Sequence, residues 1–177
     1  YFVVAHFHLV MGISALYGMF AGIYHWFPKM FGRMLNKNLG YIHFWFTFVG
    51  VYMVFFPMHY IGIAGFPRRY YTFTALGNDS MAAFTDMNMF ISIAAIITFS
   101  AQAIFAWNFF YSIFKGKIAP ANPWNSNTLE WTTPITPGHG NWPGEIPEVH
   151  RWAYDYGKDG VDFIPQTTPV GADESQH

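Results

Sequence analysis

Three long stretches of the chain contain no Asp, Glu, Lys or Arg, and these stretches are residues 1–28, 38–67 and 87–114. A bilayer hydrocarbon core of about 30 Å is crossed by roughly 20 helical residues, so each stretch is long enough to span it. We therefore predict an all-α integral membrane fold. The expected cores of its three transmembrane helices are about residues 2–26, 41–63 and 87–113.

The remainder of the chain has a different composition. Residues 1–117 carry seven Lys/Arg and two Asp/Glu, whereas residues 118–177 carry two Lys/Arg and eight Asp/Glu. The second part also holds eight of the 11 prolines and four scattered tryptophans. It has too little aliphatic material for a core of its own, so we expect 118–177 to be an irregular, extended polar tail that lies on a partner surface.

Composition narrows the class of protein and its chemistry. Charged residues make up only 11% of the 177 residues, against about 25% in soluble domains, which argues against a soluble enzyme. The net charge of −1 argues against nucleic acid as a partner. Because cysteine is absent, disulfides, thiolate-bound zinc and iron–sulfur clusters are excluded. The chain begins with Tyr1 and has no signal-peptide pattern, so we expect it to be part of a longer polypeptide.

Basic residues near the ends of the spans predict the orientation. Arg68 and Arg69 lie on one side of the membrane, and five basic residues lie on the other: Lys29, Arg33, Lys37, Lys115 and Lys117. The side with more Lys and Arg faces the cytoplasm, or the matrix in mitochondria. The first helix is therefore predicted to start on the outer side, and the tail to lie inside.

Histidines inside the apolar spans are the main candidates for function, because ionisable groups are costly in a membrane. His6 and His8 flank Phe7. Two positions along a helix correspond to a rotation of about 200°, so the two imidazoles leave on opposite faces and cannot chelate one metal. The spacing suits two separate metals or two haems, since imidazole is the commonest axial ligand of haem iron. Hydrogen bonding of both histidines to neighbouring helices fits the spacing alone equally well.

The Arg68–Arg69 pair adds a second signal on the same side of the membrane as His6 and His8. The guanidinium group binds carboxylates in a bidentate manner, so the pair could hold haem propionates at the membrane edge. Taken alone, such a pair is more often an interfacial anchor. For the other histidines in the spans we predict hydrogen-bonded structural roles, and these residues are His25, His43 and His59.

Together, these motifs resemble subunit I of the haem-copper oxidases in residue types, order and spacing. The resemblance is carried by five segments at residues 3–8, 25–28, 55–59, 67–70 and 122–134. In sequence they are Val-Val-Ala-His-Phe-His, His-Trp-Phe-Pro, Phe-Phe-Pro-Met-His, Pro-Arg-Arg-Tyr and the tail stretch that contains Leu-Glu-Trp-Thr-Thr-Pro.

The resemblance implies roles for individual residues. The chain would contain the last three of twelve core helices and the C-terminal tail. His6 would be the proximal ligand of the high-spin haem, and His8 an axial ligand of the low-spin haem. Phe7 would lie in the gap that the electron crosses, and Arg68 and Arg69 would bind propionates. Leu9 stands where many members have Tyr, which leaves both ligands intact.

The family reaction is reduction of dioxygen to water, coupled to proton translocation. The resemblance implies two haems, of a type, and a copper whose ligands lie outside this chain, so the segment alone would not be an active oxidase. Expected partners are the rest of subunit I, subunits II and III, cytochrome c or a fused or associated cytochrome domain, and the lipid bilayer. The expected location is the bacterial plasma membrane or the mitochondrial inner membrane.

Three alternative functions remain open at this point. A quinol oxidase of the same superfamily would use a different electron donor. A non-catalytic membrane electron carrier would bind haem through pairs of histidines and carry out no oxygen chemistry. A helical scaffold subunit would use the histidines only for packing.

Overall fold

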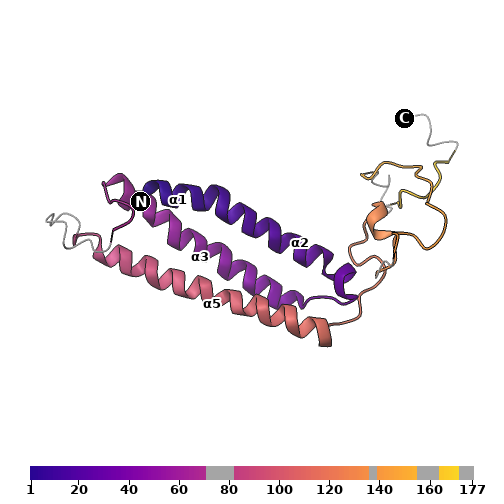
Figure 1. The fold of residues 1–177 in the computed structure, drawn as a ribbon, viewed down its shortest axis with the longest axis horizontal. Helices are drawn as coiled ribbons and strands as arrows, with labels where there is room; N and C mark the ends of the chain where they lie inside the picture. Colours follow the sequence, from indigo (N-terminus) through magenta and orange to yellow (C-terminus); the bar gives the residue numbers. More distant parts are fainter. Residues whose placement is uncertain (71–81, 136–138, 155–163, 172–177) are drawn as a thin grey trace. The chain divides into compact units, whose positions relative to one another are not determined.

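The computed structural model describes residues 1–70, 82–135, 139–154 and 164–171. Parts of the predicted tail therefore lie outside the described residues. The chain forms helices α1 (Phe2–Phe7), α2 (Ile13–Phe31), α3 (Lys37–Ile63) and α5 (Thr85–Lys115). A π-helix, His8–Gly12, joins α1 to α2, and a short 3-10 helix, Leu129–Trp131, lies in the tail (Figure 1).

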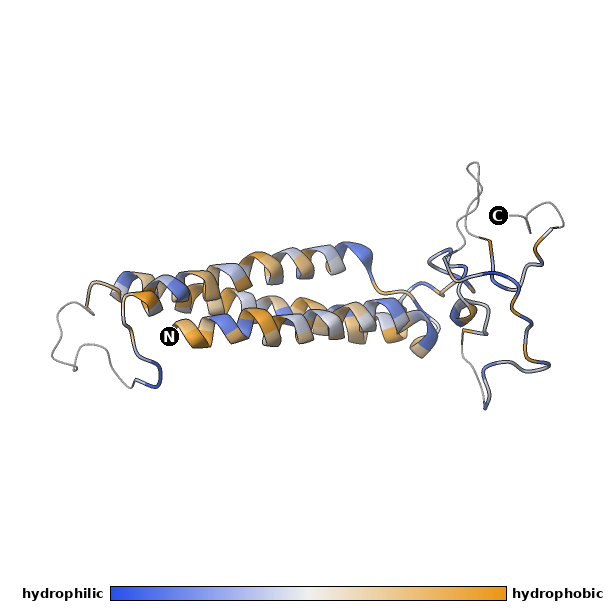
Figure 2. Cartoon of the chain, turned by 90° about the horizontal axis from the view of Figure 1, so that it is seen from above, coloured by the Kyte–Doolittle hydropathy of each residue, from blue (hydrophilic) through white to orange (hydrophobic). Residues whose placement is uncertain are grey.

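Three rods of this structure are long and apolar enough to cross a membrane: Phe2–Phe31, Lys37–Ile63 and Thr85–Lys115. Apolar residues run along all three rods, as expected for helices that cross a membrane (Figure 2). The predicted all-α membrane fold with an irregular tail is confirmed. Helices α2 and α5 continue past the uncharged cores, because Lys29 and Lys115 lie in their last turns.

The helices begin and end at residues with specific local chemistry. Asn36 caps α3, and its side-chain oxygen accepts hydrogen bonds from the backbone of Asn38 (3.0 Å) and Leu39 (3.2 Å). The fully buried amide of Asn108 in α5 then accepts from Asn36 N and donates to Asn36 O, both at 3.0 Å. Gly32, with φ of 65°, follows the end of α2 in the left-handed conformation typical of a helix C-terminus.

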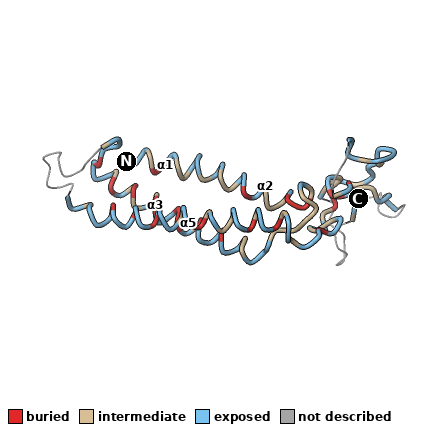
Figure 3. The backbone as a smooth tube through the Cα atoms, turned by 60° about the horizontal axis from the view of Figure 1, so that its bottom comes forward, coloured by how far each residue is buried: buried red, intermediate tan, exposed pale blue. Residues whose placement is uncertain are grey.

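The chain divides into two compact units, of which the first comprises Tyr1–Tyr24 and Asn36–Phe114. Its buried residues lie on the facing sides of the helices, and the outer sides are exposed (Figure 3). At Gly50 of α3 an added Cβ would lie 2.0 Å from Thr98 Oγ1 of α5. A glycine is therefore required for this close helix contact.

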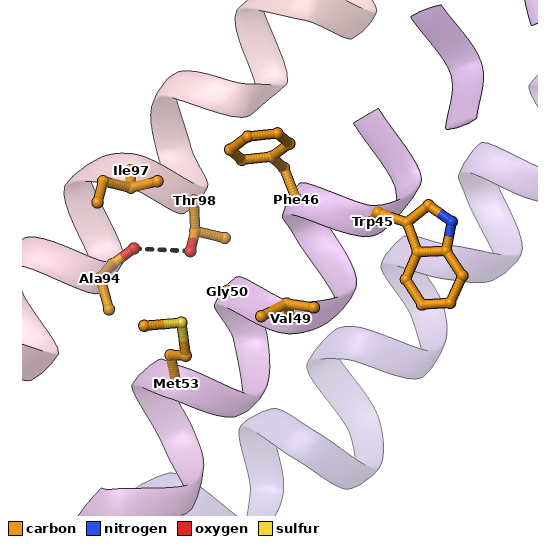
Figure 4. Close-up of a pocket in the computed structure, with 8 residues that line it drawn as sticks. All are labelled: Trp45, Phe46, Val49, Gly50, Met53, Ala94, Ile97 and Thr98. Atoms are coloured by element: carbon orange, nitrogen blue, oxygen red, sulfur yellow. Dashed lines mark hydrogen bonds between the residues drawn. The ribbon is translucent and has the colours of Figure 1, made fainter. Parts of the chain in front are cut away.

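Beside this contact lies an apolar pocket of about 310 Å³ between α3 and α5. Its lining is almost wholly apolar because the one hydroxyl there, Thr98 Oγ1, donates to Ala94 O at 2.7 Å (Figure 4). The lining residues are Trp45, Phe46, Val49, Gly50, Met53, Ala94, Ile97 and Thr98.

A buried polar network also links the helices of the first unit. His43 of α3, only 2% exposed, donates from Nε2 to Gln102 Oε1 of α5 at 3.0 Å. Gln102 Nε2 donates to Thr47 Oγ1 at 2.9 Å, and Tyr24 Oη of α2 lies 3.5 Å from His43 Nδ1. The hydrogen-bonded structural role predicted for His43 is thus confirmed, and the network satisfies polar groups that lipid cannot.

The second unit comprises His25–Leu35 and Lys115–His177. In it the ring of His25 stacks on Trp124 (5.7 Å between centroids) and meets the edge of Trp131 (5.2 Å). Lys29 Nζ lies 5.1 Å from the Trp131 ring centroid, and Trp26 donates to Glu130. Part of the tail therefore packs on the end of α2. Its expected contact with a partner surface stays a prediction.

The Gly50 contact gives a first prediction, on stability. Gly50→Ala should destabilise the purified membrane protein by about 1–3 kcal/mol, because the new Cβ has no room beside Thr98. Detergent-solubilised variants can be compared by thermal unfolding. Gly50→Ala in a Thr98→Ala background is the matched control, since Thr98 Oγ1 and Cγ2 are two of the three atoms that the new Cβ would meet, and there the loss should be smaller. An equal loss in both backgrounds would contradict the close packing.

Candidate functional site

The His6-Phe7-His8 segment lies where the backbone changes from α- to π-helix. His6 and Phe7 end α1, and His8 begins the π-helix, in which Ile13 N–H bonds back to His8 O. π-Helical turns are rare and often occur at functional sites. The three residues are therefore placed on a locally widened turn.

His8 has a fixed ring orientation. Its Nδ1 donates to Val4 O at 2.8 Å, which leaves the Nε2 lone pair available as a ligand. The imidazole stacks on the ring of Phe55 in α3, with centroids 4.9 Å apart and planes 11° apart. Nε2 makes no hydrogen bond to any described residue. A histidine whose second nitrogen is held by a carbonyl is the usual form of a metal ligand.

His6 and Phe7 have a different environment. Both are exposed, Phe7 by 43%, and the His6 ring lies parallel to Phe2, one turn earlier in the same helix, at 6.4 Å. The contact with α3 is thus made by His8. The placement of the two imidazoles on opposite faces stays a prediction from the helical spacing.

The C-terminal end of α3 holds the start of α1 in place. A Cβ added at Gly62 would lie 2.2 Å from Phe2 N, so the two backbones are in direct contact there. The Phe2 ring meets the His59 ring edge-on at 4.9 Å, and His59 Nδ1 donates to Phe55 O at 2.8 Å. His59 therefore makes a hydrogen bond of the kind predicted for it, and its purely structural role stays a prediction.

A glycine-based C-cap determines where the chain leaves α3. Phe66 N donates to Ile61 O (3.2 Å) and Gly65 N donates to Gly62 O (3.1 Å), which together form a Schellman motif. Gly65 adopts φ of 94°, and the side chains of Phe66 and Ile61 are buried together.

The arginine pair follows this cap directly. Phe66 packs on Tyr1 with ring centroids 5.1 Å apart, so the chain leaves α3 beside the start of α1. Arg68 and Arg69 are both exposed there. Arg69 has φ of 61°, which is uncommon for a residue other than glycine and costs energy. Strain of this kind is often found where a side chain must be directed towards a ligand.

These residues fit haem better than a free metal ion. In the described part of the chain, no three His, Cys, Asp or Glu side chains gather to hold an ion. A haem iron needs only one protein ligand on each side, and His8 offers an Nε2 with its second nitrogen already bonded. Exposed guanidinium groups at the same helix ends could hold carboxylates.

Comparison with known protein families decides the assignment. The family model described as cytochrome c and quinol oxidase polypeptide I matches residues 1–97, more than half of the chain. The chain belongs to this family. It is also 51% identical to a protein of Bradyrhizobium diazoefficiens named alternative cytochrome c oxidase subunit 1, over 95% of the chain and 29% of the relative.

Two further relatives are named cytochrome c oxidase subunit 1. One, from Thermostichus vulcanus, is 43% identical over 99% of the chain and 30% of the relative. The other, from Synechocystis, is 40% identical over 90% of the chain and 27% of the relative. The resemblance to subunit I of the haem-copper oxidases is thus confirmed. The chain spans less than a third of the length of these relatives.

Sequence reasoning misses the residues that support the site from α3. By sequence, Phe55 is one of many packing aromatics, although its spacing of four from His59 places both on one helix face. Gly62 and Gly65 carry no sequence signal of their own, and their roles follow from backbone contacts that only the folded chain shows.

The Schellman motif gives a second prediction. Gly65→Ala should destabilise the complex by about 1 kcal/mol, because an L-residue with a Cβ is strained at this positive φ. Gly65→Asn should cost less, since Asn tolerates the left-handed region. Denaturant or thermal unfolding of the purified complex measures both. An alanine variant as stable as the asparagine variant would contradict the proposed backbone requirement.

Proposed function

We propose that this chain supplies the haem ligands of the catalytic subunit of a respiratory terminal oxidase, which reduces dioxygen to water and translocates protons. His6 is the proximal ligand of the high-spin haem, and His8 is an axial ligand of the low-spin haem. The observation that carries this proposal is the His8 geometry, in which Nδ1 is bonded to Val4 O and Nε2 is left for iron.

The haems, together with a copper bound by residues outside this chain, supply electron transfer and dioxygen reduction when bound. The residues of this chain bind and orient the haems. Phe7 lies between the two ligands, in the gap that the electron crosses. Arg68 and Arg69 neutralise and hold propionates at the membrane edge, where the left-handed turn at Arg69 directs the pair. The proposed haem type is a.

The proposed electron donor is cytochrome c, either as a separate protein or as a fused or associated cytochrome domain. The three relatives named above carry cytochrome c oxidase in their names, which supports this donor over a quinol. The family model covers both donors, so quinol oxidation is the second candidate.

The family membership and the three apolar helices make this a membrane protein. We place it in the bacterial plasma membrane or the mitochondrial inner membrane, with residues 1–117 as the transmembrane region. The start of α1 and the arginine pair face the outer side, and residues 118–177 face the inner side. The proposed partners are the rest of subunit I and subunits II and III.

Ligand substitution provides the third prediction and the direct test. In the purified complex, His6→Ala should abolish the carbon-monoxide-sensitive high-spin band, because the high-spin iron loses its ligand. The low-spin band should remain, because His8 is unchanged. His8→Ala should do the reverse. Reduced-minus-oxidised spectra with and without carbon monoxide measure both.

Two other outcomes would contradict the proposal. Retention of both haems in both variants would mean that the two histidines serve only for packing, as in a scaffold subunit. A complex in which every haem is low-spin and unreactive with carbon monoxide would support an electron carrier instead.

The arginine pair gives the fourth prediction. Arg68→Gln and Arg69→Gln should each lower a haem midpoint potential, because a positive charge beside a propionate favours the reduced iron. Potentiometric titration of the complex measures this shift. Lys115→Gln, at the opposite end of the membrane span, is the control for a general loss of interfacial charge. Unchanged haem midpoint potentials in both arginine variants would indicate that the pair is only an anchor at the membrane interface.

A further inference from the structure

Phe55 connects two histidines of the site by two different groups. Its ring stacks on His8 with centroids 4.9 Å apart and an interplanar angle of 11°. Its carbonyl oxygen accepts a hydrogen bond from His59 Nδ1 at 2.8 Å. The first contact crosses from α3 to the π-helix, and the second lies within α3 itself.

We propose that Phe55 is a positioning residue that sets the plane of the His8 imidazole. The proposal rests on the proposed function, in which His8 binds the low-spin haem iron. Nothing in the family comparison assigns a role to Phe55, and the role follows from its parallel contact with the ligand ring.

Two constraints are needed to orient an imidazole completely. The Nδ1 bond to Val4 O fixes the direction of one nitrogen, but the ring can still pivot about that bond. The Phe7 ring, 4.4 Å from the imidazole, is tilted by 30° and so does not lie flat against it. The Phe55 face, stacked at 11°, removes the remaining freedom, because tilting the imidazole would lose contact over the whole ring. Phe55 supplies that face from a separate helix.

The position of the Phe55 ring is itself supported. Phe55 packs against the buried cluster that contains Ala5, Val54 and Met58, so its backbone belongs to the core between α1 and α3. The Phe2 ring meets His59 at 4.9 Å, which makes a second ring contact between the same two helices. The His8–Phe55 pair therefore cannot shift independently of the helix contact.

The adjacent residue offers a matched control. Phe56 is the same residue type on the same helix, is 52% exposed, and has its ring contacts with His59 and Tyr60. It makes no ring contact with His8 among the described residues. A general effect of losing a phenyl ring from α3 should therefore appear in both positions.

The test uses the intact oxidase complex and the electron paramagnetic resonance spectrum of its oxidised low-spin haem. The g-values of such a haem depend on the orientation of the axial imidazole planes, and bulk packing does not move them. Phe55→Leu should retain both haems but shift and broaden these g-values, because the branched side chain fills space without a flat face. Phe55→Tyr should restore the original g-values, and Phe56→Leu should leave them unchanged.

Each other outcome bears on a separate claim. If His8→Ala loses the low-spin haem while Phe55→Leu has unchanged g-values, the positioning role is wrong and the proposed function stands. If His8→Ala keeps the low-spin haem, the proposed function itself fails. If Phe55→Leu does not assemble, Phe55→Met replaces it. Loss of the haem in both Phe55 variants, with Phe56→Leu intact, would make Phe55 a packing residue and overturn the inference.

Discussion

The arrangement of this segment depends on how closely α3 approaches its two neighbours. Gly50 allows contact with Thr98 of α5, and Gly62 allows contact with the backbone of Phe2 in α1. In a lipid environment apolar side chains gain little by leaving their surroundings, so helix association relies on close packing and hydrogen bonds. The two glycines provide the close packing, and the His43–Gln102 pair provides a hydrogen bond. The ring contacts that orient the histidines exist only because α1 and α3 are this close.

The other end of the first rod is stabilised by different chemistry. Around His25 the aromatic faces of Trp124 and Trp131, with the cation of Lys29, combine apolar contact with charge. Such mixed contacts are suited to the interface between membrane and water, where one side of a group is dry and the other is wet. Trp124 and Trp131, which look isolated in the sequence, thus pack against the end of α2.

Much of the fold could be predicted from the sequence because membrane helices are long and uncharged, and this pattern is local. The spacing of His6 and His8 predicts that their rings lie on opposite faces, and this stays a prediction. The π-helix could not be predicted, because regular and widened helical turns contain the same residue types. Phe55 could not be chosen among 20 phenylalanines without knowing which helix faces His8. Gln102 and Asn108 were likewise unremarkable polar residues until their partners 59 and 72 positions away were known.

The π-helix at His8–Gly12 has a consequence for how the length of this segment can vary. A π-turn holds one residue more than the α-turn it replaces, so deleting a single residue there would restore a regular helix instead of breaking it. Because the extra residue is taken up within one turn, the residues before the deletion would keep nearly the same rotation relative to α2. His6 and His8 would stay on their present sides, and only the residues of the widened turn after His8 would change direction. The same deletion in the regular part of α2 would instead rotate everything before it by about 100°. A change of one residue in length is therefore absorbed at this turn and would not be absorbed elsewhere in the helix.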